Sequence, residues 1–559
     1  MKALGKFSET YVRYLLVFGL IVLVVSIIVL SLVPPVSKDA LVHHLAVPKL
    51  YLEHGGIYEI PFMRFSYYPM NLELLYLIPL YFGNDIIPKF IHFSFALLTG
   101  LLLFRYLKRR LGSSYALFGV ILFLSVPIIV KLSITVYVDL GLIFFSTASL
   151  LLILEWVESG FRWRLLGFSA LMCGLGLGTK YNGLVTLFLL TLFVPFLYSR
   201  YYRGKRAGIL GCVGRGVFFL LIALAVFSPW MLRNYHCKHN PLYPLYDRVF
   251  NPPKTLQGKH SLQKAGASSP PSLFTYRRVI YHEKWWEIAL LPIRIFFQGK
   301  DGDPRYFDGK LNPFLFLLPF LAFYKLKEDP EDLRVEKKVI VAYATLFFAF
   351  AFFSAGLRIR YISPIIPALV ILSVMGIKKI AERVNASGGH SPGTLGVSIA
   401  VLVSVSALAY NGRYIAGQFR YVNPFPYIRG YVTRDQYISR YRPEYPAVEY
   451  INKCLPQDAK VLFIFLGNRG YYCKRQYLYG GDALYRVFLK ARSGEEIYLG
   501  LRKIGVTHLF IYDFLFERWI HDNFPEKNRE PLREFFQRYT KRLYYKNGFS
   551  ILSLKYPAC

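Results

Sequence analysis

The chain has 559 residues, of which 54% are hydrophobic and only 18% are charged. Many apolar runs approach the roughly 20 residues that cross a bilayer, so the composition excludes a soluble globular protein and predicts a polytopic α-helical membrane protein. The 68 basic and 34 acidic residues give a formal net charge of +34. Because membrane topology and anionic lipids account for this charge better than nucleic acid does, we expect membrane lipids and no nucleic acid among the partners.

The first apolar run, Leu15 to Val33, contains no charged residue and follows Lys2, Lys6 and Arg13. It is too long for the apolar region of a signal peptide and lacks a small-residue cleavage site. Since basic residues flank membrane spans on the cytoplasmic side, we expect an uncleaved anchor with a cytoplasmic N-terminus. The loop 34–85 then lies on the extracytoplasmic side of the membrane.

Further apolar runs bring the expected number of spans to about 11. They are Ile86 to Phe104, Ser114 to Val130, Val138 to Leu154, Leu165 to Thr179, Gly183 to Tyr198, Val217 to Leu232, Leu311 to Tyr324, Val339 to Leu357, Tyr361 to Ile377 and Thr394 to Tyr410. The short basic loops alternate strictly onto one side, as the positive-inside bias predicts. We therefore expect a transmembrane domain over residues 1–411 of a cell (inner) membrane protein, with outer loops 34–85 and 234–310. The two shortest runs are expected to be extended, tilted or partly re-entrant.

The tail, 412–559, has a different pattern and is expected outside the membrane. Strand-like runs alternate in it with helix-compatible segments, which predicts a small extracytoplasmic α/β domain. The strand-like runs are Lys460 to Leu466, Val506 to Tyr512 and Ser550 to Lys555, and the helix-compatible segments include Gly481 to Ala491 and Arg529 to Leu543. A disulfide between Cys454 and Cys473 is one hypothesis and free thiols are the other.

The loop after the first span concentrates side chains that indicate chemistry. Its segment from Ser37 to Pro69 carries Asp39, His43, His44, Arg64, Tyr67 and Tyr68. We expect this segment to supply a general base, Asp39, in a polar surround at the membrane surface. The histidines can bind a metal, but the sequence offers no further clear ligand, so we favour loop orientation or sugar contact and infer no firm cofactor. The tyrosines suit either an interface belt or stacking on sugars.

A second carboxylate, Asp139, lies at the outer end of the fourth span in TVYVDLGLIFF. An aspartate at mid-span is unfavourable by about 2.5–3.5 kcal/mol, so such a residue tends to lie at a helix end or face a wet cavity. A functional role and a simple interaction with the helix dipole explain Asp139 equally well.

Several cations face outward in short segments, against the bias that the other short loops follow. They and their neighbours are Lys180, Tyr181, Arg233, Asn234, Arg358, Arg360 and Tyr361. Any one of the cations can be explained by snorkelling at a helix end. As a set they are typical of a site for a phosphate-bearing lipid, because guanidinium and ammonium groups stabilise phosphate oxygens.

The order of these motifs resembles the bacterial multi-spanning glycosyltransferases of the GT-C type, which include the dolichyl-phosphate-mannose protein mannosyltransferases and the aminoarabinose transferases that modify lipid A. The motifs are KDALVHHLAVPKLYLEHGGIYEIP, YYPMNLELLYLIPL, the outer Asp139, LGTKYNG, SPWMLRNYHCKHNPLYPL and RIRYISPIIP. The resemblance covers most of the chain.

The resemblance implies an inverting transfer from a polyprenyl-phosphate sugar to a lipid, glycan or protein acceptor at the outer face of the membrane. The first-loop carboxylate of the family corresponds to Asp39, and its second outer carboxylate to Asp139. Many members carry an Asp-Glu pair in the first loop, whereas Asp39 is followed here by Ala40. This departure leaves the acceptor class and any metal dependence open.

Two other functions use the same features. A lipid or glycan flippase would move its substrate across the membrane without forming a new bond. Such transporters often show internal repeats, and we find no convincing repeat here. A glycan polymerase or ligase would instead accept an oligosaccharide linked to a lipid pyrophosphate.

Overall fold

The computed structural model describes residues 2–202, 208–252, 273–353, 356–383, 393–526 and 529–555. The chain divides into two compact units. The first unit consists of Met1–Leu32, Tyr67–Leu75 and Ile87–Pro424, and the second of Val33–Ser66, Tyr76–Ile86 and Phe425–Cys559. The expected boundary after residue 411 therefore lies inside a helix, α18 (Gly393–Val422).

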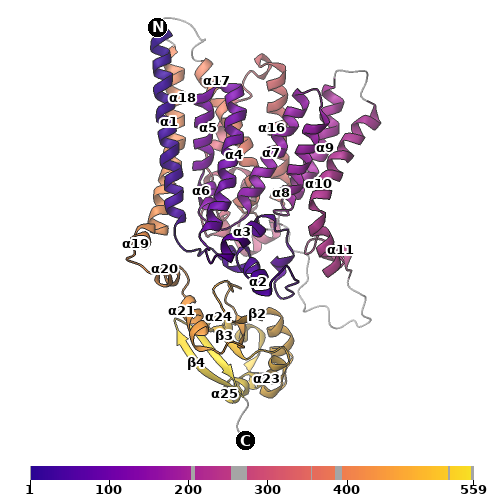
Figure 1. The fold of residues 1–559 in the computed structure, drawn as a ribbon, viewed down its shortest axis with the longest axis vertical. Helices are drawn as coiled ribbons and strands as arrows, with labels where there is room; N and C mark the ends of the chain where they lie inside the picture. The colour runs from indigo at the N-terminus through magenta and orange to yellow at the C-terminus, as the bar shows by residue number, and fades with distance from the viewer. Residues whose placement is uncertain are drawn as a thin grey trace. The chain divides into compact units, whose positions relative to one another are not determined.

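The first unit is helical throughout the part that the structure describes (Figure 1). The helices of its bundle are α1 (Lys2–Ser31), α4 (Ile87–Leu111), α5 (Ser113–Ser125), α6 (Pro127–Ser133), α7 (Asp139–Glu158), α8 (Trp163–Leu177), α9 (Gly183–Tyr201), α10 (Ile209–Lys238), α15 (Phe314–Leu321), α16 (Glu331–Phe352), α17 (Ile366–Arg383) and α18. Short helices lie in its loops: α11 (Asp247–Phe250), α12 (Leu273–Ile280), α13 (Trp285–Ala289), α14 (Leu291–Phe297) and η5 (Ile359–Tyr361). Helix α3 (Asn71–Tyr81) crosses the boundary between the units.

The chain is a multi-pass membrane protein, as expected. Among the described residues, seven helices are long and apolar enough to cross a bilayer, and the bent pair α5 and α6 makes an eighth if it forms one span. The seven are Glu9–Ser31, Ile87–Leu111, Asp139–Glu158, Gly183–Tyr201, Ile209–Lys238, Ser363–Glu382 and Gly396–Val422. Each coincides with an expected span.

Three expected spans do not meet this test of length and composition. Leu165 to Thr179 corresponds to α8, which has only 15 residues. Leu311 to Tyr324 contains the eight-residue α15, which rises about 12 Å and is too short to cross a bilayer alone. Val339 to Leu357 lies largely in α16, whose first half is rich in charged residues.

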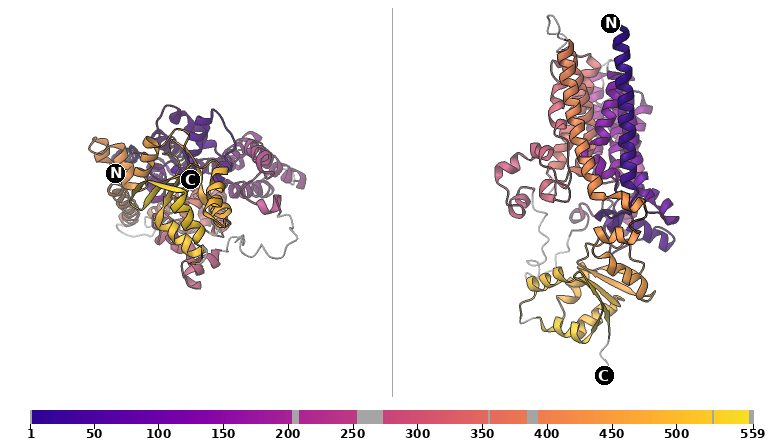
Figure 2. Two further views of the ribbon diagram at one scale, coloured as in Figure 1. Left: turned by 90° about the horizontal axis from the view of Figure 1, so that it is seen from below. Right: turned by 90° about the vertical axis from the view of Figure 1, so that its left-hand side faces the viewer.

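Helices of the first unit pack through small and polar residues as well as apolar ones. Helices α1 and α18 run side by side (Figure 2). Ser149 of α7 and Ser169 of α8 each donate a hydrogen bond of 2.8 Å to the backbone carbonyl of the other. Such small hydroxyl residues let two helices approach closely, and their hydroxyl groups find hydrogen-bond partners inside a membrane protein.

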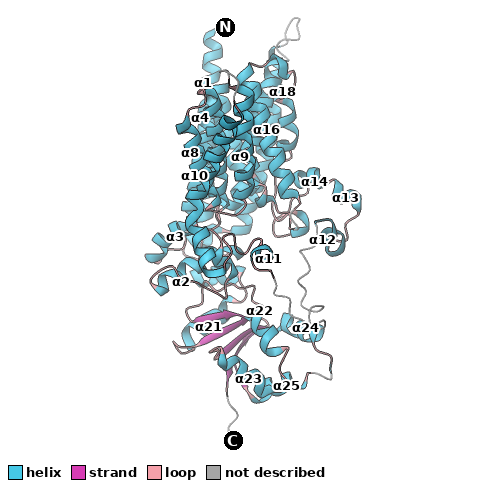
Figure 3. Cartoon of the chain, turned by 90° about the vertical axis from the view of Figure 1, so that its right-hand side faces the viewer, coloured by secondary structure: helices cyan, strands magenta, loops and turns pink. Residues whose placement is uncertain are grey.

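The second unit contains a five-stranded sheet in the order β2-β1-β3-β5-β4 (Figure 3). Strand β1 pairs in parallel with β2 and β3, whereas β5 pairs antiparallel with β3 and β4. The strands are β1 (Lys460–Ile464), β2 (Gln476–Tyr479), β3 (His508–Tyr512), β4 (Thr540–Lys546) and β5 (Phe549–Leu554). The helices are η1 (Ala40–His44), α2 (Ala46–His54), η2 (Arg64–Tyr67), α19 (Pro424–Ile428), α20 (Arg434–Tyr441), α21 (Tyr445–Cys454), α22 (Gly480–Ala483), η7 (Leu484–Phe488), α23 (Gly494–Lys503), α24 (Asp513–Asn523) and α25 (Glu530–Arg538).

The predicted α/β pattern of the tail is confirmed in its main elements. All three expected strands form, as β1, β3 and β5. Their inward residues build one core with the helices, for example Leu462, Leu509 and Phe535. The helix expected over Arg529 to Leu543 is partly wrong, because α25 ends at Arg538 and the last residues of the expected range, from Thr540 onward, belong to strand β4. The disulfide hypothesis is also wrong for this structure, since Cys454 and Cys473 are both free.

A buried ion-pair network organises the loop that contains α12, α13 and α14. Glu283 accepts hydrogen bonds from Arg277 at 2.5 and 2.7 Å and from Arg294 at 3.1 Å. The two guanidinium groups hold the pKa of Glu283 below its ordinary value, although burial opposes them. The ionised carboxylate therefore stabilises this loop above the ordinary pKa of a glutamate, and the stabilisation is lost as the pH falls through the lowered pKa.

We expect Glu283→Gln to loosen this loop, because removing one partner of a buried ion pair costs about 3–5 kcal/mol. Hydrogen exchange and limited proteolysis of the purified protein should detect faster exchange and cleavage between α12 and α14. Glu530→Gln is the matched control, since its partner Arg533 and Glu530 are both mostly exposed. Equal protection of the loop in both variants would contradict the role of Glu283.

Candidate functional site

A buried ion pair between Asp139 and Lys180 lies at one end of the helical bundle. Asp139 begins α7 and is completely buried, and its Oδ1 accepts a hydrogen bond of 2.5 Å from Lys180 Nζ. Lys180 lies in the turn between α8 and α9, and 16% of its side chain is exposed. The structure thus brings together two residues that the sequence analysis singled out separately.

His92 of α4 fixes the start of α7 beside this pair. Its Nε2 accepts a hydrogen bond of 3.0 Å from the backbone N–H of Leu140. Its Nδ1 lies 3.0 Å from the carbonyl oxygens of Leu132 and Thr135, so Nδ1 carries the proton. The imidazole therefore satisfies one of the unpaired N–H groups that every helix N-terminus presents.

Aromatic rings hold the cations near Asp139. Lys180 Nζ lies 5.5 Å from the ring centroid of Tyr361, and the guanidinium of Arg360 lies 5.4 Å from the same ring. Arg360 also lies 5.3 Å from the ring of Tyr137. Its charge acts on Asp139 across the cluster. Cation–π contacts of this kind attract a cation to the face of the ring and orient it.

A second network of amide and tyrosine groups extends from the same turn. Asn234 Nδ2 donates to the carbonyl of Tyr67 at 2.9 Å, to the Tyr181 hydroxyl at 3.1 Å and to the carbonyl of Tyr243 at 3.2 Å. The Tyr181 hydroxyl donates to the Tyr243 carbonyl at 2.9 Å. Burial raises the pKa of Tyr181, so its hydroxyl remains a neutral donor.

Arg233 joins this network to α3. Its guanidinium donates to Asn234 Oδ1 at 2.9 Å and to the carbonyl of Tyr68 at 3.3 Å, and it lies 4.8 Å from the ring of Trp230. Trp230 Nε1 in turn donates to Asn71 Oδ1 at 2.8 Å. The expected residues of the first unit, apart from Arg358, therefore fall into two neighbouring networks around the α8–α9 turn.

Arg358 lies against a different partner. Its guanidinium lies 3.4 Å from Oδ2 of Asp308, and Oδ1 of the same carboxylate lies 3.1 Å from Lys131 Nζ. The backbone N–H of Ile359 donates to the carbonyl of Phe307 at 2.9 Å. Arg358 thus helps to fasten the turn that carries Arg360, and the carboxylate of Asp308 partly neutralises its charge.

The remaining expected residues belong to the second unit. Asp39 is partly buried and precedes η1, while Arg64 is exposed at the start of η2. His43 and His44 are buried, and the ring of His43 stacks on Phe65 at 4.6 Å. The expected role of these histidines, in loop orientation or sugar contact, stays a prediction. Among the described residues, no group of three or more His, Cys, Asp or Glu side chains could hold a metal.

The Asp39 segment is tied to the C-terminal part of the chain inside the second unit. The backbone N–H of Tyr471 donates to the carbonyl of Leu41 at 3.2 Å. Lys49 Nζ donates to the carbonyls of Tyr471 and Cys473 at 2.9 and 2.5 Å. The loop that carries Asp39 is therefore supported by the segment between β1 and β2.

The sequence analysis missed two polar residues of the first unit's site. His92 lies in the middle of an apolar run, where nothing marked it as a helix-capping group. Glu73, in the first turn of α3, was not singled out either, yet only 3% of its surface is exposed. A lone acid in an otherwise apolar stretch was the available signal.

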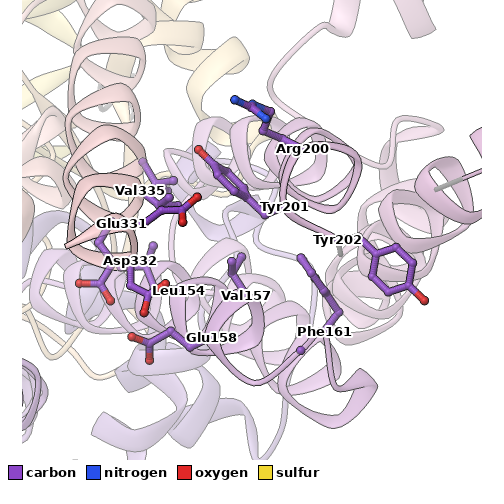
Figure 4. A pocket seen from close by; sticks show the side chains of 13 residues that line it. Leu154, Val157, Glu158, Phe161, Arg200, Tyr201, Tyr202, Glu331, Asp332 and Val335 are labelled. Atoms are coloured by element: carbon purple, nitrogen blue, oxygen red, sulfur yellow. The ribbon is translucent and has the colours of Figure 1, made fainter. Parts of the chain in front are cut away.

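A cavity of about 710 Å³ lies at the opposite end of α7. Figure 4 shows the carboxylates of Glu158, Glu331 and Asp332 on one side of it and the ring of Phe161 on the other. Glu158 is also paired with Arg109 at 2.7 Å. Because α7 has 20 residues and rises about 1.5 Å per residue, roughly 28 Å of helix separates this cavity from Asp139. The cavity is therefore not part of the charged site.

Comparisons with known proteins support the expected resemblance. Residues 82–232 match the family described as dolichyl-phosphate-mannose-protein mannosyltransferase. A search of curated protein sequences found no match. The structure is similar to ArnT from Cupriavidus metallidurans in the apo state, with 14% identity, a TM-score of 0.56 and 97% of each chain covered.

Two further solved structures share this fold. One is ArnT from Cupriavidus metallidurans bound to undecaprenyl phosphate, with 14% identity, a TM-score of 0.55 and coverage of 96% of this chain and 97% of that chain. The other is the apo oligosaccharyltransferase of Archaeoglobus fulgidus, with 12% identity, a TM-score of 0.54 and coverage of 96% and 75%. The predicted polytopic GT-C-like fold is confirmed.

We expect Lys180→Met to destabilise the protein, because it leaves the buried charge of Asp139 without its ammonium partner at a cost of about 3–5 kcal/mol. Thermal unfolding of the purified protein measures this as a lower Tm. In the double variant Asp139→Leu with Lys180→Met, both charges are removed, and the Tm should return towards that of the wild type. A Lys180→Met protein with the wild-type Tm would contradict the importance of the pair.

Proposed function

We propose that this chain, which has the fold of GT-C type membrane glycosyltransferases, transfers a sugar from a polyprenyl-phosphate-linked donor to a lipid, glycan or protein acceptor. The observation that carries the proposal is the convergence of cations on one end of the helical bundle. Lys180, Arg233 and Arg360 come from the α8–α9 turn, α10 and η5, which are far apart in the sequence. A likeness to a structure bound to undecaprenyl phosphate supports the same ligand class.

The cations fit the leaving group of such a reaction. A lipid phosphate gains negative charge as the bond from its oxygen to the sugar breaks, and donors fixed in advance stabilise this charge. Rings and carbonyl oxygens hold Arg233 and Arg360 in place, so little reorganisation is needed when the phosphate arrives. Asp139 orients Lys180 and balances its charge.

Asp39 is the proposed general base. The acceptor oxygen or nitrogen forms a bond to the anomeric carbon of the sugar, while the bond from that carbon to the phosphate oxygen breaks and its electrons remain on the phosphate. The proton of the acceptor moves to the Asp39 carboxylate. Attack from the face opposite to the leaving group inverts the anomeric configuration. The transfer takes place at the outer face of the membrane in the expected topology.

Asp39→Asn should reduce sugar transfer at least about 100-fold, because an amide cannot accept the proton. Membranes are incubated with a labelled polyprenyl-phosphate sugar, and new glycosidic products are separated by chromatography. Binding of the unlabelled polyprenyl phosphate should stay close to that of the wild type, which shows that the variant is folded.

Glu53→Gln is the matched control, because Glu53 lies on the neighbouring α2 with half of its side chain exposed. Near-normal transfer by Asp39→Asn would refute the base assignment. Movement of label across the membrane without any new bond would instead indicate a flippase.

A further inference from the structure

Helices α12, α13 and α14 form a lateral segment of the first unit, residues 273–297, that the proposed transfer does not use. Figure 3 shows the three helices projecting sideways from the helical bundle. Several of their large apolar side chains are exposed, and we call this surface the apolar face of the segment. It consists of Trp285, Trp286, Leu290, Ile293 and Phe297. An exposed apolar surface of this kind marks a site of contact with a partner.

Four residues of the apolar face lie on one line along α13 and α14. Trp286, Leu290, Ile293 and Phe297 are spaced by four, three and four residues, which is the spacing of one face of an α-helix. The helical hydrogen bonds continue across the junction, because the carbonyl of Trp286 accepts from the N–H of Leu290 at 3.0 Å and the carbonyl of Leu290 from that of Arg294 at 2.9 Å. The two short helices therefore present a single apolar stripe.

The opposite side of α13 and α14 is apolar as well. Its residues Ile288, Leu291 and Ile295 are buried against the rest of the first unit. A helix that is apolar on all sides belongs in a protein core or in lipid, whereas a helix at a water surface keeps one polar side.

The charged residues of the segment are turned inward. Arg277, Glu283 and Arg294 are buried and form the ion-pair network of this loop. A surface that meets water has the reverse arrangement, because burial removes the hydration of a charge and water excludes apolar surface. The inverted arrangement fits a segment whose outer side contacts lipid.

Aromatic contacts join both ends of the segment to the helical bundle. The rings of Phe274 in α12 and Phe352 at the end of α16 have centroids 6.5 Å apart. The ring of Phe297 in α14 lies 6.2 Å from that of Phe316 in α15, which lies 5.5 Å from the exposed ring of Phe320. The apolar face is therefore continuous with the exposed apolar side of the bundle.

Hydrogen bonds place the segment at the end of the bundle that carries Asp139. Arg277 donates to the carbonyl of Arg305 at 2.7 Å. Two residues further on, the carbonyl of Phe307 accepts from the backbone N–H of Ile359 in η5 at 2.9 Å. Since η5 also carries a cation whose charge acts on Asp139, the segment and the ion pair lie at the same end.

The residues that flank the apolar face suit the polar edge of a bilayer. Arg278, Lys284 and Lys300 are exposed along the chain before and after it. Tryptophan favours the boundary between headgroups and acyl chains, and cations bind the phosphate groups of lipids. Lysine is depleted at interfaces between proteins, so this combination favours a lipid surface over a protein partner.

We propose that the apolar face of the α12–α14 segment docks on the bilayer, with its side chains among the headgroups and upper acyl chains of the leaflet nearer Asp139. A helix lying in this boundary buries its apolar side about 5–10 Å into it. Bulk membrane lipid is the partner, so the docking does not depend on the proposed transfer.

Hydroxyl-radical footprinting of the wild-type protein in lipid nanodiscs tests whether the face meets water. Trp285 is 81% exposed in the chain alone and Tyr545, in β4 of the second unit, is 60% exposed. If both met water, Trp285 would be oxidised more, after correction for the reactivity of each side chain. Docking predicts at least about fivefold less oxidation at Trp285 than at Tyr545, because the radicals form in water. Equal or greater oxidation at Trp285 would overturn the proposal.

Quenching by brominated lipids identifies what covers the face. Each nanodisc holds one copy of the chain and no polyprenyl phosphate, and the emission of the pair is the difference between the wild type and a Trp285→Phe, Trp286→Phe double variant. Bromine on the upper acyl chain should lower this emission at least about twofold. Trp519→Phe is the matched control, because Trp519 packs on the core of the α/β region and its emission should not change.

The outcomes distinguish lipid from the other occupants of the face. Protection of Trp285 without quenching would show that another part of the chain covers the face, and would overturn the proposal. Protection that appears only with two copies in a nanodisc, or only after addition of polyprenyl phosphate, would also overturn it. If the double variant does not fold, the footprint of the wild type in single-copy nanodiscs still decides. Neither experiment measures sugar transfer, so the proposed function can fail while this docking holds.

Discussion

The Asp139–Lys180 ion pair is the interaction on which the polar end of the helical bundle depends. A carboxylate with no exposed surface is strongly unfavourable unless a cation and hydrogen bonds compensate it. This requirement fixes the distance between the start of α7 and the α8–α9 turn, because the two charged atoms lie 2.5 Å apart. The imidazole of His92 then holds α7 from the side of α4. Helix α4, the start of α7 and the α8–α9 turn are thus held together around this ion pair.

The cations around this point are held in different ways, and the difference bears on chemistry. Arg358 lies against the carboxylate of Asp308, and Lys180 against that of Asp139. Arg360 and Arg233 are oriented by the faces of Tyr137 and Trp230. An aromatic face orients a cation, whereas a carboxylate also neutralises its charge.

Sequence patterns predicted the elements whose formation depends on local composition. Apolar runs near 20 residues became spanning helices, and short β-branched and aromatic runs became β1, β3 and β5. The patterns failed where tertiary contacts decide. Leu311 to Tyr324 is apolar but forms only the short α15, and β4 replaces the end of a predicted helix because it pairs with β5. Asp139 and Lys180 were both identified, but their pairing joins positions 41 residues apart, which one sequence cannot reveal.

The sequence pattern did not connect the first loop with the C-terminal tail, yet both belong to the second compact unit of the chain. Lys49 binds the carbonyls of Tyr471 and Cys473, and the hydroxyl of Tyr472 donates to the carbonyl of Pro35 at 2.7 Å. In the proposed function this loop presents the general base, and small displacements of a catalytic group slow a reaction greatly. The α/β region therefore has a direct physical reason to accompany the membrane helices, because it supports the backbone on both sides of Asp39.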